Sequence, residues 1–287
     1  MEARTYPRNS ASHNQLRYLY DVIGEHDKAL PEAQEALRLA PRVGPLVWIV
    51  MAEYMNLDRF DDAKSYAEKA FSRNLAVPML HTLLLRIAFI QDDHSAQDME
   101  IEWLAGKPEE VQSLQYQAYN AVMHGQRRKA NELFQRVNEV ARRQGLTGVQ
   151  GDSPAAVDAR MGDCEAARKD VLCGDAAAVR LAAEQAAKNP PPNPDTAQLL
   201  YRRGLAGLRA GKGPEAAAEF QKILDHKGRN WGPEYSQAYL GLARAKALAG
   251  DRAKAKRAYQ DFLALWKDAD PDMPTLIAAR KEYAALN

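Results

Sequence analysis

The chain has 287 residues, of which 46% are hydrophobic and 27% are charged, and its formal net charge is +1. This composition excludes a disordered chain, and the charge balance argues against nucleic acid as the main partner, because nucleic-acid-binding proteins usually carry a basic excess. The apolar run at residues 79–90 is interrupted by His81 and Arg86 and is shorter than the roughly 18 residues of a membrane span. We therefore expect an ordered, soluble, cytoplasmic chain without a signal peptide.

The first predicted unit is a helix over residues 13–23, a tight turn at Gly24 and an amphipathic helix that ends at Pro41. Small residues from Ala29 to Ala40 lie on one face of the second helix, where they let two helices approach closely. The first of these alanines recurs about every 34 residues, at Ala29, Ala63, Ala96 and Ala130. This period predicts four helix pairs, at about residues 11–41, 45–75, 78–108 and 111–145.

The period breaks after Arg143, where residues 144–153 are rich in glycine and polar side chains and predict a connector. Two Gly-Asp turns that follow are too close together for a full helix pair. A helix over residues 175–188 and a stiff proline-rich spacer over residues 189–194 come next. The sequence thus predicts three parts: an N-terminal array (1–145), an irregular helical connector (146–194) and a C-terminal part (195–287).

The C-terminal part regains the helical pattern. Two further helix pairs are predicted at residues 195–226 and 235–267, with a lengthened loop at residues 226–233 between them. A last helix over residues 274–286 is apolar on one face and charged on the other. It would cap the exposed end of a stack of helix pairs, as such stacks require.

The repeating unit resembles the tetratricopeptide (TPR) repeat, whose motif spacing is matched by Leu16, Tyr20, Gly24, Ala29, Ala36 and Pro41. Arg17 replaces the first small residue of that motif. The resemblance implies an all-α fold, an α-α superhelix built as a right-handed solenoid of antiparallel helix pairs with a C-terminal capping helix. It also implies that the first helix of each pair lines a concave groove for a protein or peptide partner.

The register of the motif places eleven residues in this groove: Asn14, Tyr18, Trp48, Met55, Asn56, His81, Leu85, Phe89, Gln115, Tyr119 and Met123. Rigid aromatic rings and methionine supply contact area, and amides can bind an extended backbone. A peptide-binding groove is therefore the functional interpretation. The alternative for Trp48 and Phe89 is that they complete the core between helices.

No catalytic site, metal site or cofactor is expected. The sequence contains no HExxH, GxSxG or dinucleotide-binding motif, and its histidines and cysteines lack the spacing of a zinc site. Cys164 and Cys173 would be too far apart on one helix to form a disulfide, so we expect thiols. Two other classes stay open: an enzyme with a deep pocket and a perturbed acid or histidine, and a nucleic-acid adaptor whose arginines converge on one face.

A second resemblance concerns the segments AAAEFQKILDHKG and AKRAYQDFLALWKDADPDMPTLIAARKEYAAL. They are similar to the C-terminal TPR half of bacterial, acidobacterial-type serine/threonine protein kinases, and winged-helix regulators with a similar half exist. This implies a signalling scaffold or sensor, or a regulatory region that acts in cis on an effector domain. No kinase motif occurs in the chain, so we expect no phosphoryl transfer by that mechanism. In a membrane-anchored parent kinase, this half could be extracytoplasmic.

Overall fold

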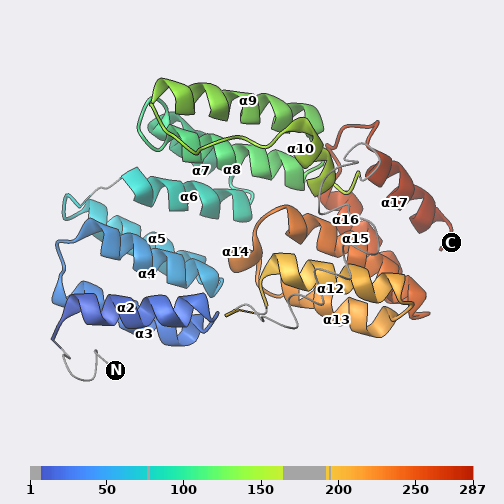
Figure 1. Cartoon of the computed structure of the whole chain (residues 1–287), viewed down its shortest axis with the longest axis horizontal. Helices are drawn as coiled ribbons and strands as arrows, with labels where there is room; N and C mark the ends of the chain where they lie inside the picture. Colours follow the sequence, from blue (N-terminus) through green and yellow to red (C-terminus); the bar gives the residue numbers. More distant parts are fainter. Residues whose placement is uncertain (1–7, 76–77, 164–191, 194, 287) are drawn as a thin grey trace. The chain divides into compact units, whose positions relative to one another are not determined.

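The computed structural model describes residues 8–75, 78–163, 192–193 and 195–286, and all regular secondary structure in these residues is helical (Figure 1). The bounds of the first nine helices are α2 (Ser10–Val22), α3 (His26–Leu39), α4 (Gly44–Asn56), α5 (Phe60–Phe71), α6 (Pro78–Ile90), α7 (His94–Leu104), α8 (Glu110–Met123), α9 (Arg127–Arg143) and α10 (Pro154–Arg160). The others are α12 (Ala197–Arg209), α13 (Gly213–Leu224), α14 (Lys227–Asn230), α15 (Pro233–Leu248), α16 (Arg252–Leu265) and α17 (Pro274–Ala284). The predicted all-α fold of paired helices is confirmed.

The predicted helices lie close to their expected bounds, and residues 144–153 form the expected non-helical connector. The loop predicted between the last two helix pairs contains the one-turn helix α14, which the sequence pattern did not indicate. Cys164, Cys173 and the helix predicted over residues 175–188 lie outside the described residues.

The chain forms two compact units. Unit 1 comprises Met1–Ser113 together with His226–Arg229, and unit 2 comprises Leu114–Asp225 together with Asn230–Asn287. The boundary therefore lies within α8, and a four-residue segment from late in the sequence belongs to the N-terminal unit. The division at residues 145 and 195 that the sequence predicts remains a prediction about domains.

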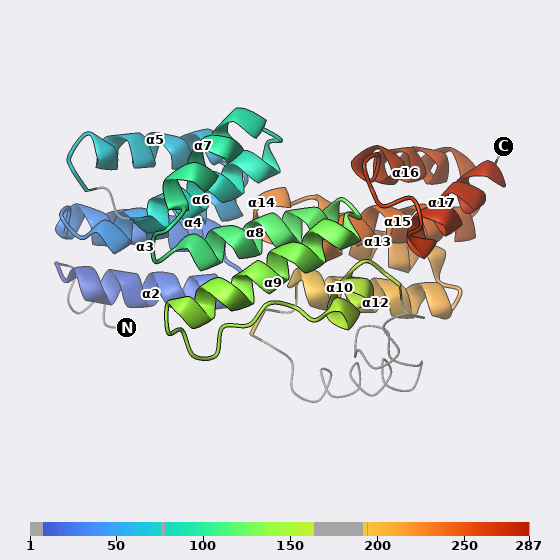
Figure 2. The same ribbon diagram turned by 90° about the horizontal axis from the view of Figure 1, so that it is seen from above.

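Unit 1 contains the helix pairs α2/α3, α4/α5 and α6/α7, which follow one another in Figures 1 and 2. Each pair turns at a residue with left-handed backbone geometry: Gly24 (φ 79°), Asp58 (φ 58°) and Asp92 (φ 56°). Glycine adopts this geometry freely, whereas an aspartate does so at some cost. Ala29 and Ala63 are fully buried at the helix crossings, as the period predicted.

The third pair departs from the alanine pattern. Ala96 is only half-buried, and α7 buries Glu100 and Leu104 in its place. Asp93 caps the start of α7, and its carboxylate accepts the backbone N–H of Ala96 at 3.0 Å. The third pair thus has a similar length and the same kind of turn as the other two, but different side chains of its second helix are buried.

Unit 2 joins the fourth predicted repeat to the C-terminal helices. The indole Nε1 of Trp266, which is fully buried, donates to the carbonyl of Met123 at 2.8 Å, and the amide of Asp270 donates to the carbonyl of Gly125 at 3.1 Å. A Cβ on Gly125 would lie 2.8 Å from the Trp266 ring, so only glycine fits beside it. The segment after α16 therefore packs against the turn between α8 and α9.

The core of the C-terminal pairs is built around the ring of Phe220 on α13. This side chain is fully buried, and the backbones of Gly204 on α12 and Gly241 on α15 approach it closely. A Cβ at either glycine would lie 2.6 Å from the ring. The missing side chains of these two glycines create the space that the phenyl ring fills.

The last helix, α17, is fixed to the preceding pair by Glu282. Arg244 donates to both carboxylate oxygens of Glu282 at 2.9 Å, and the hydroxyl of Tyr259 donates to it at 2.7 Å. Burial opposes ionisation of Glu282, but the hydrogen bonds from Arg244 and Tyr259 outweigh it and lower its pKa. The predicted capping helix is therefore held by a charge-assisted contact as well as by its apolar face.

Gly241→Ala is expected to destabilise unit 2 by about 1–3 kcal/mol, because the added methyl group overpacks the site of Phe220. The free energy of unfolding in urea would measure this. Phe220→Leu in the same chain should recover part of the loss, since it makes room for the methyl group. Strictly additive effects of the two substitutions would contradict the proposed contact.

Glu282→Gln is expected to lower the melting temperature at pH 7, and the difference from the wild type should shrink as the pH falls below 4.5. Folding lowers the pKa of Glu282 below its ordinary value of 4.5. The ionised carboxylate therefore stabilises the fold fully above pH 4.5, and this stabilisation is lost as the pH falls through the lowered pKa of the folded state. Thermal melts between pH 3 and pH 7 would measure the difference. Glu132→Gln, at an exposed position of α9, is the control and should show no such trend.

Candidate functional site

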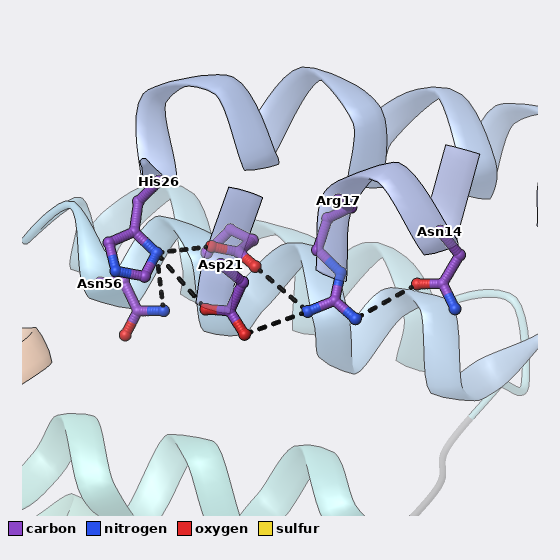
Figure 3. A network of polar contacts seen from close by, with 6 residues as sticks. Asn14, Arg17, Asp21, His26 and Asn56 are labelled. Atoms are coloured by element: carbon purple, nitrogen blue, oxygen red, sulfur yellow. Dashed lines mark hydrogen bonds and ion pairs between the residues drawn. The ribbon is translucent and has the colours of Figure 1, made fainter. Parts of the chain in front are cut away.

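A polar network joins three helices of unit 1 (Figure 3). Arg17 on α2 lies 3.4 Å from the carboxylate of Asp21 and 3.5 Å from that of Glu53 on α4. His26, the first residue of α3, places Nδ1 3.0 Å from Glu53 and 3.5 Å from Asp21. Glu53 is only 1% exposed, so a buried carboxylate is held by a guanidinium and an imidazole.

Helix spacing brings these side chains together. Asn14, Arg17 and Asp21 are three and four residues apart and share one face of α2. Glu53 and Asn56 are likewise three residues apart on α4. Figure 3 shows Asn14 and Asn56 at opposite ends of the network.

Two residues predicted for the groove belong to this network. The amide oxygen of Asn14 accepts from Arg17 at 3.5 Å, and the amide nitrogen of Asn56 lies 3.3 Å from Nδ1 of His26. The sequence interpretation missed Arg17, Asp21, His26 and Glu53. The one available signal was Arg17, because it stands where the TPR motif has a small residue.

The ligand atoms of Asp21, His26 and Glu53 lie within 4.8 Å of one another, which is close enough for a shared metal ion. The guanidinium of Arg17 already contacts both carboxylates, so a divalent cation would have to compete with it. Burial, followed by the charge of Glu53, raises the pKa of Asp21, while His26 and Arg17 act in the opposite direction. The geometry is that of an internal ion-pair network.

A second feature of unit 1 is the segment His226–Arg229, which lies against the ends of α4 and α6. Asp58 accepts the backbone N–H of Gly228 at 2.6 Å and also lies 3.3 Å from the His226 ring. Arg86 donates to the carbonyl of Gly228 at 2.8 Å, and the ammonium of Lys227 donates to the carbonyl of Ile90 at 2.5 Å. Unit 1 thus binds both backbone groups of one residue.

The remaining predicted groove residues of unit 1 differ in exposure. Tyr18 is 56% exposed, with the Arg17 guanidinium 5.8 Å from its ring centre, and Trp48 is half-buried. His81 lies between Phe71 and Trp103 in a stack of rings and contacts Glu100 at 2.7 Å. His81 therefore fastens three helices together.

Four predicted groove residues are buried in the structure: Met55, Leu85, Phe89 and Met123. In this conformation their side chains belong to the core and offer no surface to a partner. Helical spacing placed them on the inward face of a first helix, but it could not show how deeply neighbouring segments cover that face.

Three predicted groove residues, Gln115, Tyr119 and Met123, belong to unit 2. The ring of Tyr119 packs edge-on against Phe134, and the guanidinium of Arg160 lies 5.6 Å from its centre. Arg160 is itself paired with Asp152 at 2.5 Å. Gln115 is half-buried on α8.

Unit 2 also contains a cavity of about 350 Å³ lined by residues of α10, α12, α15 and α17. Its polar lining includes Arg160, Arg244 and Tyr201, and the two arginines are already paired with Asp152 and Glu282. Burial raises the pKa of Tyr201 to about 12. This phenol keeps its proton at neutral pH and is suited to donate a hydrogen bond rather than to act as a base.

No family model and no curated protein matches the chain. Among solved structures, the crystal structure of the P58(IPK) TPR domain at 2.5 Å resolution matches 99% of this chain and 90% of its own, with 13% sequence identity and a TM-score of 0.28. The paired-helix architecture follows from the chain's own structure.

Among the helices of the described residues, none is both long enough and apolar enough to cross a bilayer.

Glu53→Gln is expected to destabilise unit 1 by about 3–5 kcal/mol, because it removes the buried carboxylate that pairs with Arg17 and contacts the ring of His26. Urea unfolding would measure the cost, and hydrogen exchange would localise it to α2, α3 and α4. Asp21→Asn is the matched control: the raised pKa of Asp21 means that its charge is not favoured there, so neutralising it should cost much less. Equal losses for both variants would contradict the central place of Glu53.

Proposed function

We propose that this chain is a protein-interaction module, a scaffold or sensor, in which the first helices of the pairs in unit 1 bind a segment of a partner protein. The observation that carries this proposal is the way unit 1 holds residues 226–229. Asp58 and Arg86 bind the N–H and the C=O of Gly228, so side chains of unit 1 recognise a peptide backbone. Recognition of backbone groups is the general basis on which a protein surface binds extended or turned segments of other chains.

The accessible groove residues support the same proposal. Tyr18 presents an exposed ring beside Arg17, whose guanidinium is fixed by two carboxylates. A rigid aromatic ring next to an immobilised cation loses little entropy on binding, and such pairs are common at the energetic centres of interfaces. Asn14, Trp48 and Asn56 are the other binding residues proposed for unit 1, and Gln115 and Tyr119 on α8 stay proposed binding residues of unit 2 by the repeat register alone.

Selection from a random peptide library displayed on phage, with the purified chain as bait, tests the proposal. We expect selected peptides to bind the wild type and to lose about tenfold in affinity with Tyr18→Ala, which corresponds to about 1.4 kcal/mol. Met99→Ala, at a 60% exposed position on α7, is the control and should leave the affinity unchanged. The proposal fails if no peptide is selected, whereas selected peptides that bind Tyr18→Ala as tightly as the wild type would remove Tyr18 from the binding surface.

The finer assignments rest on the sequence resemblance. We propose a place in a bacterial signalling protein of the serine/threonine kinase-associated type, in the cytoplasm, with no catalytic activity of its own. A regulatory role in cis on a kinase or winged-helix effector domain is the alternative. The functional domains proposed with it are residues 1–145, 146–194 and 195–287.

A further inference from the structure

The segment His226–Arg229 is bound in unit 1 at a place where only glycine fits. A Cβ on residue 228 would lie 1.9 Å from the carbonyl oxygen of Met55 and 3.0 Å from the Asp58 carboxylate. Gly228 is buried, and both of its backbone groups are hydrogen-bonded to unit 1. The end of α4 therefore selects a residue without a side chain.

Asp58 occupies a turn position that glycine would fill without strain. It has a φ of 58° and corresponds to Gly24 in the first pair, Asp92 in the third and Gly125 in the fourth, all of which also have positive φ. A left-handed aspartate costs free energy. Its carboxylate accepts a hydrogen bond from the Gly228 amide at 2.6 Å and faces His226 at 3.3 Å, so at this turn the aspartate side chain contacts the bound segment.

The residue before the glycine is recognised as a cation. Lys227 donates to the carbonyl of Ile90, the last residue of α6. Carbonyl groups at a helix C-terminus lack partners within the helix and carry partial negative charge. One turn earlier on the same helix, Arg86 donates to the Gly228 carbonyl. Thus α6 binds both the ammonium group of Lys227 and the backbone carbonyl of the next residue.

We infer that the surface formed by Met55, Asp58, Arg86 and Ile90 is a recognition site for a Lys-Gly sequence, and that the chain's own Lys227-Gly228 occupies it as an internal ligand. The partner of this surface is a protein segment that carries lysine followed by glycine. This inference rests on the proposed function and assigns its ligand chemistry and its regulation. Because an internal segment is present at a high effective concentration, a partner binds only where it displaces residues 226–229.

The test uses a fluorescent peptide with the sequence of residues 225–231, DHKGRNW, and the full chain. In Gly228→Ala the internal segment no longer fits, so we expect the peptide to bind this variant at least tenfold more tightly than the wild type. Gly232→Ala is the matched control from the same loop: its Cβ would meet no atom closer than 3.7 Å, so it should behave as the wild type. Fluorescence anisotropy measures all three affinities.

Two further variants locate the site. Asp58→Asn, combined with Gly228→Ala, should abolish the gain, because the charge-assisted bond to the peptide's glycine is lost. A peptide with alanine in place of glycine should bind none of the proteins. Equal affinity of the peptide for Gly228→Ala and the wild type would overturn the inference, as would an unchanged gain in the double variant.

Trypsin gives a second readout, because it cleaves after Lys227 and Arg229. We expect slow cleavage there in the wild type and in Gly232→Ala, and fast cleavage in Gly228→Ala. Equal rates in all three would show that the segment is not held. If Gly228→Ala does not fold, as judged by circular dichroism, Lys227→Ala replaces it, since it removes the contact with Ile90 and leaves the glycine in place.

The two proposals fail in different ways. Library peptides that depend on Tyr18, together with a DHKGRNW peptide that binds no variant, would leave the interaction module standing and remove the Lys-Gly site. The opposite pattern would keep the site at α4 and α6 and remove the one at α2.

Discussion

Close approach of neighbouring helices is the constraint on which the rest of this structure depends. Ala29, Ala63 and Ala130 are fully buried where the helices of three pairs cross, and a larger side chain at these positions would force the backbones apart. The same principle appears in unit 2, where Gly204 and Gly241 leave space for the ring of Phe220. Small residues thus fix the distance between helices, and the large side chains fill the spaces that remain.

Polar side chains in unit 1 restrict how the packed helices are oriented. Glu53 is nearly inaccessible to solvent and has two basic partners, so its network defines how α2 and α3 meet α4. Apolar packing alone would tolerate small rotations of a helix, whereas a buried carboxylate tolerates few arrangements of its partners. We suggest that the network holds Arg17 still, and that Tyr18 beside it gains from this as a binding residue.

The capture of residues 226–229 links the architecture to the proposed function. A turn aspartate, a helix-borne arginine and a helix C-terminus together bind a short basic segment through its backbone and one ammonium group. Their combination at the ends of α4 and α6 is what gives the surface a preference for a cation followed by glycine.

The sequence by itself determined the paired helices and their turns, but not α14, because helical periodicity, alanine spacing and turn residues are local signals. The repeat register also predicted Asn14 and Asn56 as site residues, and in the structure both belong to one polar network. Only the tertiary structure decided that Met55, Leu85 and Phe89 are buried and that Glu53 meets Arg17 and His26. The tertiary structure also decided that the amide of Gly228 donates to the carboxylate of Asp58. These residues are 170 positions apart, and no local sequence pattern encodes such a contact.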